Sequence, residues 1–438
     1  MERKHKKIIV ETSRIILGLV FVFSGFVKAV DPWGGAYKIL DYFTAFEFTE
    51  YGPWAIPLSF FQAALEFGVG VCLLLGIYRR ISSILILLIM LFMTPLTLYL
   101  AIANPVSDCG CFGDALVITN WQTFYKNIIL LIAAIIVYFW YRLMTPFFTK
   151  RAYTSAISWI CLFIFGVAIY CYFFLPVFDF RPYKIGTNIP EKMEVPKDAE
   201  HDVYEVQLIY SKDGREKKFT MDNYPKNDST WTFVDSKSRM IKEGYRPPIH
   251  DFSITNAQED DITDEVLSNP SYTFLLISHR LKEAEDTNVD EINRIYDFSV
   301  EKGYDFYALT ASLPGEIQGW IENSGAEYPF CTTDEITLKT IIRSNPGLVL
   351  IKNGTIINMW SNFQLPDITK LNKLIDETNQ GKMIKVHNFF TLFFLTVIFI
   401  LPLVGLYFID VTIFKKMKKN RRRHRRKHGH RHGRGYGH

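Results

Sequence analysis

Six long apolar blocks constrain the fold of this chain more than any other feature. Four lie within the first 150 residues, a fifth runs from about Ser155 to Val177, and a sixth from about Phe389 to Phe408. Each is close to the roughly 20 residues that a helix needs to cross the hydrocarbon layer of a membrane. Because a helix satisfies its own backbone hydrogen bonds in lipid, the sequence predicts an α-helical polytopic membrane bundle of about six spans.

The basic residues near the ends of these blocks predict the orientation. They precede the first block, separate the second from the third at Arg79 and Arg80, and separate the fourth from the fifth. Because loops rich in Lys and Arg stay cytoplasmic, we expect both termini in the cytoplasm and residues 178–387 in the periplasm, with the chain in a bacterial inner membrane. The first block is embedded in a unit of four, so we expect it to be retained rather than cleaved as a signal peptide.

The C-terminal tail, residues 413–438, is basic and rich in His. From Lys415 it carries twelve Lys and Arg and no acid, so the formal net charge of +4 hides an acidic body. Such a tail is expected to fix the topology and bind anionic membrane lipids, at ~1 kcal/mol per residue near the surface. Nucleic-acid binding and metal capture by its His residues are alternatives, but we expect no nucleic-acid partner. Its Gly, His and Arg repetition is typical of a disordered, low-complexity end.

The six cysteines divide according to this topology. Three lie in spans, where a buried thiol usually acts as a small apolar residue; they are Cys72, Cys161 and Cys171. Three lie outside, in a compartment expected to be oxidising; they are Cys109, Cys111 and Cys331.

Cys109 and Cys111 form the most informative motif, in NPVSDCGCFGD. Two cysteines separated by one glycine can close a small ring only with backbone distortion, for which Gly110 supplies the freedom in φ. Strain and exposure make a disulfide easier to reduce, which is typical of catalytic disulfides. We expect the flanking Asp108 and Asp114 to disfavour a thiolate. The pair is a candidate catalytic redox pair, with a loop-closing structural disulfide, metal ligation and inert thiols as alternatives; without further ligands nearby, no metal is predicted.

Three local features of the first 145 positions carry a family resemblance. They are FVFSGFVKAVDP with Ser24, Gly25, Lys28, Asp31 and Pro32, the DCGCFGD loop, and WQTFYKN with Trp121 and Asn127. With these features the segment resembles the DoxX family, and within it the branch related to the methylamine utilisation protein MauE. The resemblance implies a four-span membrane domain at residues 1–150, linked to disulfide formation during maturation of a periplasmic enzyme.

This bundle is also similar to quinone-linked disulfide oxidases, so a quinone is the candidate cofactor, although no cofactor is evident in the sequence. Lys28 and Asp31 are further candidate site residues. As alternatives, Lys28 could snorkel to the membrane interface, and Ser24 and Gly25 could merely permit close helix packing.

The remainder predicts a fifth span at 151–178, an extracytoplasmic region, and a sixth span at 388–412. Within the region, residues 179–246 read as β-rich, with a hairpin formed by DVYEVQLIY and EKKFTMD around KDGR. Residues 247–387 alternate strands with helices, which predicts an α/β layer. The strands are YTFLLIS, YDFYALTAS, GLVLIKNG and TIINMWSN, the helices lie near 288–302, 314–324 and 334–343, and the last two strands turn at Asn353 and Gly354.

Pro346 precedes the last two predicted strands. With this proline and order of elements, residues 247–387 resemble the thioredoxin-like fold, particularly its peroxiredoxin and TlpA branch, which implies a cis bond before Pro346 beside the active surface. The chain departs from the family at ISHRLKEAEDT, which has no cysteine where the family carries CxxC, so we expect no ordinary dithiol chemistry at His279 or its neighbours. Cys331, the only thiol of this domain, is another candidate, although a buried apolar role is expected.

Two functions from different classes remain. In the first, the chain is a thiol-disulfide oxidoreductase whose Cys109/Cys111 pair passes electrons between a periplasmic or envelope partner and a quinone or other membrane carrier. In the second, it is a non-catalytic scaffold whose thioredoxin-like domain binds an envelope partner while the CxC loop is a structural clasp. A transporter is a third reading, but we expect no charged pair or helix break at mid-membrane of the kind transporters use.

Overall fold

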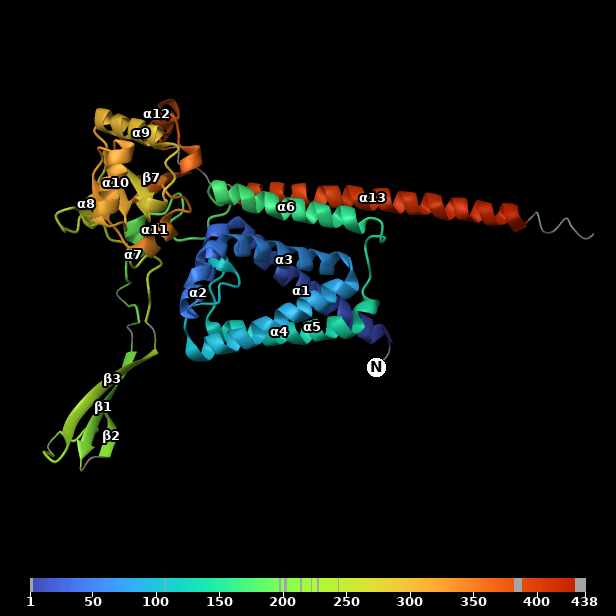
Figure 1. The fold of residues 1–438 in the computed structure, drawn as a ribbon, viewed down its shortest axis with the longest axis horizontal. Coiled ribbons are helices and arrows are strands. Elements are labelled where there is room, and N and C mark those ends of the chain that lie inside the picture. Colours follow the sequence, from blue (N-terminus) through green and yellow to red (C-terminus); the bar gives the residue numbers. More distant parts are fainter. Residues whose placement is uncertain are drawn as a thin grey trace, which may run out of the picture.

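The computed structural model describes residues 3–106, 108–196, 198–200, 203–212, 215–221, 223–226, 228–242, 244–381 and 388–429. In these ranges, six helices are long and apolar enough to cross a membrane. They form a helical membrane bundle beside an α/β domain (Figure 1). The predicted fold class is therefore confirmed.

The bundle is built around a close antiparallel pair of helices, α1 and α3. Its long helices are α1 (Arg3–Val30), α3 (Ala55–Leu75), α4 (Arg79–Ala103), α5 (Asn120–Trp140), α6 (Tyr153–Phe173) and α13 (Asn388–Gly429). Gly25 of α1 lies against the backbone of Ala63 and Phe67, and a Cβ there would collide with it. Gly25 thus has the close-packing role that was one alternative for it.

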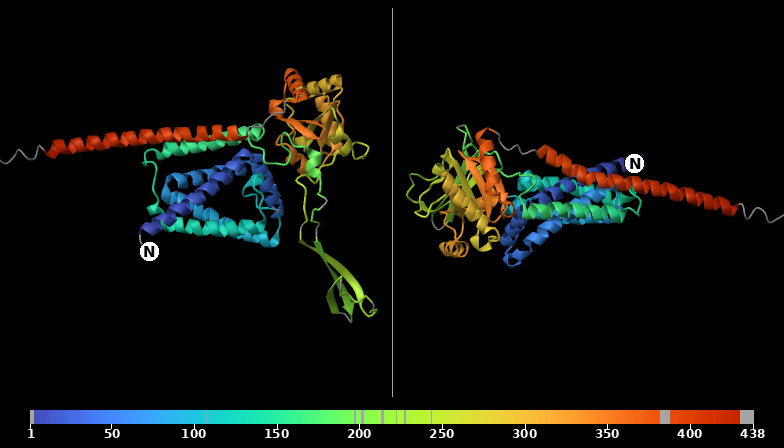
Figure 2. Two further views of the ribbon diagram at one scale, coloured as in Figure 1. Left: turned by 180° about the vertical axis from the view of Figure 1, so that it is seen from behind. Right: turned by 90° about the horizontal axis from the view of Figure 1, so that it is seen from above.

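Helices α6 and α13 lie side by side along the bundle (Figures 1 and 2). The indole of Trp159 donates to the carbonyl of Phe399 at 3.0 Å, and the carboxylate of Asp410 accepts from the backbone N–H of Thr149 at 2.7 Å. The start of α1 and the far end of α13 both lie at the end of the bundle away from the α/β domain.

Two helices differ from expectation. The segment between the first two spans, for which no helix was predicted, contains α2 (Pro32–Ala45) and the short η1 (Thr49–Trp54). Asp31 caps α2 by accepting from Gly34 N–H at 2.8 Å, whereas the glycines at 34 and 35 concealed the helix because glycine disfavours helices. Helix α13 continues past the predicted span to Gly429, so the tail is helical that far and the expectation of disorder there is wrong; residues 430–438 lie outside the described ranges.

The α/β domain contains a five-stranded sheet of order β6-β5-β4-β7-β8. Its strands are β4 (Tyr272–Ser278), β5 (Asp305–Thr310), β6 (Phe330–Thr332), β7 (Gly347–Lys352) and β8 (Thr355–Ser361). Strands β4, β5 and β6 run parallel, and β7 and β8 are antiparallel to their neighbours. The predicted strands and the Asn353-Gly354 turn are confirmed, both turn residues having positive φ, and the Asn345–Pro346 bond is cis, as the resemblance implied.

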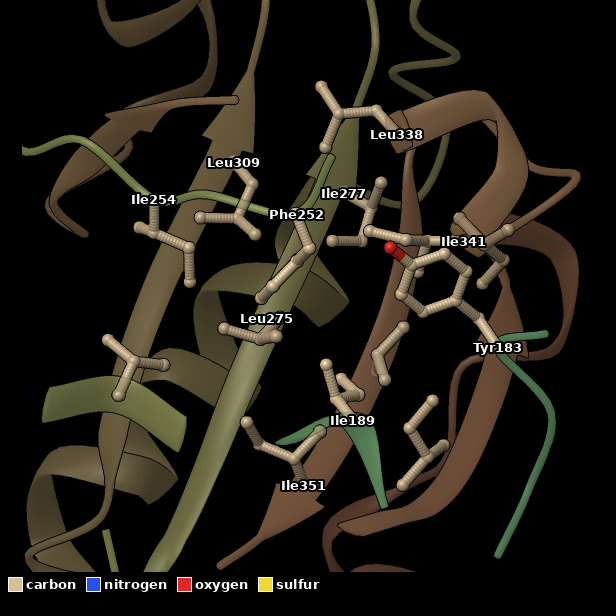
Figure 3. Packing of buried hydrophobic residues seen from close by; sticks show 14 of the residues in the cluster. Tyr183, Ile189, Phe252, Ile254, Leu275, Ile277, Leu309, Leu338, Ile341 and Ile351 are labelled. Carbon is tan, nitrogen blue, oxygen red and sulfur yellow. The ribbon is translucent and has the colours of Figure 1, made fainter. Parts of the chain in front are cut away.

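Helices cover both faces of this sheet. They are α7 (Ile189–Met193), α8 (Thr263–Ser268), α9 (Val289–Lys302), α10 (Pro314–Ser324), α11 (Glu335–Ile341) and α12 (Ile368–Asn379). Every residue of β4 is buried, because alternate side chains point to opposite faces and both are covered. Leu275 and Ile277 enter one core (Figure 3), and Phe274 and Leu276 enter the other.

A three-stranded antiparallel sheet projects from this domain (Figures 1 and 2). It consists of β1 (Val203–Lys212), β2 (Arg215–Thr220) and β3 (Thr232–Lys242) in the order β2-β1-β3, and it contains the predicted hairpin. Tyr183 and Ile189, which precede the sheet, pack in the core of the α/β domain (Figure 3). The small sheet is therefore an insertion in a domain that begins before residue 247.

Candidate functional site

The CxC loop joins α4 to α5 and is tied at both ends. Helix α4 ends at Asn104, whose φ is +47°. The side chain of Asn120, at the start of α5, donates to Asn104 Oδ1 at 2.9 Å and to the carbonyl of Val106 at 3.0 Å. Thr119 and Gln122 form a capping box on α5. These bonds fix the loop on the end of the bundle that faces the α/β domain.

The two cysteines of the loop lie side by side as free thiols. Their Sγ atoms are 2.8 Å apart, and Gly110 has a φ of +66°, as its proposed role requires. Cys109 is buried and Cys111 is partly buried. Because a disulfide bond is about 2.05 Å long, the sulfur atoms need to move by less than about 1 Å to bond, so the arrangement suits either a redox pair or a clasp.

The two thiols have different acidities. The hydrogen bond with Cys109, helped by the charges of Lys126 and Lys28 and opposed by burial, lowers the pKa of Cys111 to about 7. The same hydrogen bond and burial raise the pKa of Cys109. Cys111 is therefore the thiol of the pair that ionises more readily.

This corrects the expectation that the flanking acids disfavour a thiolate. Asp108 is 3.0 Å from the ammonium of Lys38, and Asp114 is 3.1 Å from the guanidinium of Arg343. Each carboxylate is thus paired with a cation from another element, while the cations near Cys111 stabilise its thiolate.

Lys28 lies directly beneath the loop. It is 7% exposed, and its ammonium group donates to Glu66 Oε2 at 2.7 Å, to Ser24 Oγ at 2.8 Å and to the carbonyl of Cys111 at 2.8 Å. The Ser24 hydroxyl lies 2.6 Å from Glu66 Oε2 and 2.5 Å from the Cys111 carbonyl. The Lys28 side chain therefore does not extend to the membrane interface. Ser24 is bonded to the loop, so its role is not limited to close helix packing.

Glu66 was not predicted as a site residue. It is the one charged residue in AIPLSFFQAALEFGVGVCLLL, and an ionisable residue within a span is a signal of function. It pairs with Lys28, which lies in the last turn of α1 beneath the CxC loop, so the pair does not contradict the expectation of no charged pair at mid-membrane. The pair contacts the CxC loop through the Cys111 carbonyl.

Two cavities flank the loop. The smaller, about 50 Å³, is lined by both cysteines and by Lys28, Glu66 and Lys126, together with apolar residues of α1, α4 and α5. The larger, about 390 Å³, lies between the bundle and the α/β domain and is lined by Gly110, Asp114 and Arg343 among others. The sulfur atoms thus face the interior of the bundle, and the backbone of the loop faces the α/β domain.

Arg343 connects the α/β domain to the loop. Its guanidinium lies 2.9 Å from Asp31 and 3.1 Å from Asp114, and its side chain is 6% exposed. Burial would raise the pKa of Asp31, but Arg343 outweighs burial and lowers it; burial raises the pKa of Asp114, with Arg343 opposing. Asp31, a predicted site residue, is therefore part of the contact between domains.

Helix α2 contributes to the same contact. The Tyr37 ring lies 6.3 Å from the ring of His279, 4.9 Å from the Lys339 ammonium and 5.4 Å from the Arg343 guanidinium. Burial lowers the pKa of His279 to about 4, so this imidazole is neutral at pH 7. Tyr37 of the bundle thus lies against His279, in the segment where the resemblance places a CxxC motif.

Of the remaining candidates, Asn127 lines the small cavity together with both cysteines, whereas Cys331 lies in the α/β domain. Cys331, in β6, is 4% exposed in the core of the α/β domain, and burial raises its pKa to about 11, which suits an apolar role. Asn127 is buried and donates to Thr97 at 3.2 Å, whereas Trp121 is 47% exposed. Within the described ranges, no group of three or more His, Cys, Asp or Glu could hold a metal ion.

The comparison with known families divides the chain. Residues 6–140 match the family described as "Methylamine utilisation protein MauE". This part of the chain is similar to MauE. The match spans the first four membrane helices and the CxC loop, while the wider DoxX resemblance stays a prediction. Residues 204–243, the projecting sheet, match a domain of unknown function, DUF8463.

No curated protein matches the chain. Among solved structures, a thioredoxin-like protein from Aeropyrum pernix is 14% identical over 29% of this chain and 89% of its own, with a TM-score of 0.24. A thiol peroxidase from Chromobacterium violaceum is 12% identical over 30% of this chain and 86% of its own, also with a TM-score of 0.24. The assignment of the α/β domain therefore rests on its own strand order and cis-proline.

Proposed function

We propose that this membrane protein is a thiol-disulfide oxidoreductase in which Cys109 and Cys111 accept electrons from a partner's dithiol and pass them to a quinone. The observation that carries the proposal is the pair itself: two sulfur atoms 2.8 Å apart, with the pKa of Cys111 lowered to about 7 by Cys109, Lys126 and Lys28. Stabilising a thiolate stabilises the reduced pair, which makes the corresponding disulfide a stronger oxidant.

The exchange proceeds in two half-reactions. A thiolate of the partner attacks Cys111 Sγ, the Cys109–Cys111 bond breaks, and Cys109 leaves with the electron pair and takes up a proton. The partner's second thiolate then attacks the partner's own sulfur in the mixed disulfide and releases Cys111 as a thiolate. The partner is now a disulfide and the pair holds two electrons. When the pair is oxidised again, the Cys109–Cys111 bond forms, Cys109 loses its proton and two electrons leave the pair; a membrane quinone would supply the two-electron acceptor.

A quinone is the proposed acceptor because of the direction in which the sulfur atoms face. Both line the small cavity together with Met90 and Met93 of α4 and Leu130 of α5, inside the bundle. We propose that a carrier dissolved in the membrane approaches the pair from this side of the loop. A cavity of about 50 Å³ is too small to enclose a quinone ring, so it indicates the side from which an acceptor would approach and is not itself a quinone site.

The competing proposal is the scaffold. It is favoured by the buried contact of Arg343 with Asp31 and Asp114, which joins a domain without CxxC to the loop. In that case the CxC bond only fixes the loop, and the α/β domain binds an envelope partner.

We further propose that the chain lies in a bacterial inner membrane with both termini cytoplasmic and 178–387 periplasmic. The support is the set of basic residues at the ends of the first spans, including Arg79 and Arg80. A reporter enzyme fused after the last residue should be active only in the cytoplasm, and periplasmic activity would reverse the proposed orientation.

The oxidoreductase is tested with single serine variants of the pair in the full chain. Cys111→Ser and Cys109→Ser should each abolish turnover of a reduced dithiol peptide with quinone, because each leaves one thiol without its neighbour, and at least one variant should trap a mixed disulfide on non-reducing gels. Cys331→Ala is the control and should retain activity. Full activity of both serine variants, with no trapped adduct, would contradict the oxidoreductase and favour the scaffold.

A further inference from the structure

We propose that Lys28 and Glu66 form a buried pair of positioning residues that holds Cys111 and balances the charge around its thiolate. The inference rests on the proposed function, in which Cys111 is the thiol that exchanges with the partner. In the described part of the chain, neither side chain is hydrogen-bonded to a sulfur atom. Both act through the backbone of Cys111, through Ser24, and through charge.

The first step of the argument is the set of bonds on the Cys111 carbonyl. That oxygen accepts from Lys28 Nζ at 2.8 Å and lies 2.5 Å from Ser24 Oγ. Both donors sit on one face of α1, four residues apart, and α1 is held against α3 by the close approach at Gly25. Cys111 is therefore positioned by helix α1, which packs closely against α3.

The second step is the dependence of Lys28 on Glu66. The two side chains are 7% and 12% exposed, and their charged atoms are 2.7 Å apart. A buried ammonium without a counter-charge is unfavourable, so Glu66 stabilises the cation under the loop, alongside the Cys111 carbonyl and Ser24. Gln62 also donates to Glu66 Oε1 at 3.0 Å, so both carboxylate oxygens are bonded.

The third step is the charge around Cys111 from every neighbouring element. Lys28 of α1 and Lys126 of α5 favour its thiolate, and Glu66 of α3 opposes it. Within the loop, Cys109 donates to it, and Asp108 is paired with Lys38 of α2. Tyr42 of α2 donates to the Cys109 carbonyl at 3.0 Å. Lys28 and Glu66 thus act on the thiolate with opposite signs.

This opposition gives a test that loss of structure cannot imitate. Lys28→Gln removes a positive charge and should slow alkylation of Cys111, whereas Glu66→Gln removes a negative charge and should speed it. The double variant restores electrical balance and should return close to the rate of the unaltered protein. A merely structural pair would instead move both single variants in the same direction.

The measurement is the iodoacetamide reaction of the reduced full chain in detergent, followed at the Cys111 peptide by mass spectrometry at pH 6. At a pH below the pKa of Cys111, a shift of one unit in that pKa changes the thiolate fraction about tenfold. A more acidic thiol is also a weaker nucleophile, so the alkylation rate changes only roughly threefold. We expect changes of about this size, with opposite signs. The potential of the pair against glutathione should fall in Lys28→Gln and rise in Glu66→Gln.

Glu11→Gln is the matched control. Glu11 is also paired in the bundle, with Arg14, but it binds Thr145 at the opposite end, so its loss should leave Cys111 unchanged. If a single variant does not insert, the double variant and the charge-keeping Lys28→Arg, which should both resemble the unaltered protein, carry the test.

Three outcomes would overturn the inference. The alkylation rate of Cys111 could change in the same direction in both single variants, or it could equal that of Glu11→Gln in both. The double variant could also differ from the unaltered protein as much as the more strongly affected single variant does. The alkylation rate requires no exchange with a partner. Failure of the proposed function would instead appear as turnover that survives Cys109→Ser and Cys111→Ser, so the two failures are distinguishable.

Discussion

The membrane bundle and the α/β domain each offer a place for thiol chemistry, and the two places meet at one interface. In the bundle, Cys109 and Cys111 are held by charged residues from α1, α3 and α5. In the α/β domain, the end of β4 carries His279 and no cysteine, and Tyr37 of α2 covers it. The CxC loop thus has reactive thiols with charged residues around them, whereas the end of β4 contacts the bundle.

This difference shows why fold alone does not assign chemistry. The α/β domain keeps the sheet order and the cis-proline of its resemblance, yet its single thiol is a core residue. The loop that does carry two thiols belongs to the helical bundle. If the α/β domain acts mainly as a contact surface, substitutions in its interface with the bundle should lower the stability of the full chain more than substitutions elsewhere in the domain.

The largest expected effect on stability is that of Arg343→Met. The substitution leaves Asp31 buried without its cation, and breaking a buried ion pair typically costs about 3–5 kcal/mol. Asp114 loses the same partner. We expect a lower apparent Tm of the full chain in detergent and faster protease cleavage in the segment 174–188, which joins α6 to the α/β domain.

The effect should depend on pH with a defined sign. Because the pKa of Asp31 is lowered from 3.8, its ion pair contributes stability that is fully present above pH 3.8 and lost as pH falls through the lowered pKa. The difference between the variant and the unaltered protein should therefore shrink in acid. An equal difference at pH 7 and pH 3 would mean that Asp31 does not carry the effect.

The sequence contained the parts of this interface but not their pairing. Apolar length predicted the spans, and alternation with helices predicted the sheet. Arg343 and Asp31 are 312 positions apart, and no local period links them. Glu66 is visible in the sequence as a lone charge in an apolar block, but its partner depends on how α1 and α3 pack, and the acidity of Cys111 depends on charges from three helices.

An intermediate loss of stability is expected for Cys331→Ser. The hydroxyl would be buried in an apolar core, where an unsatisfied polar group costs roughly 1–3 kcal/mol. Unfolding of the α/β domain, followed by circular dichroism, should shift to lower temperature, while the alkylation rate of Cys111 stays unchanged. A changed rate at Cys111 would show that the two places are coupled through the domain, against the comparison drawn above.

The smallest effect is expected for Glu335→Gln, at the exposed edge of the same interface. Burial opposes ionisation of Glu335, but hydrogen bonds from Arg280 and Lys339 lower its pKa to about 2. The Arg280 and Glu335 side chains are 53% and 29% exposed, so solvent screens the pair and its loss should cost about 0–1 kcal/mol at pH 7. This contribution is present above pH 4.5 and is lost as pH falls toward 2. Thermal unfolding at pH 7 and pH 3 measures it, with Arg280→Met as the matched partner variant. A loss as large as that of Arg343→Met would mean that the exposed edge, rather than the buried contact with Asp31, holds the two domains together.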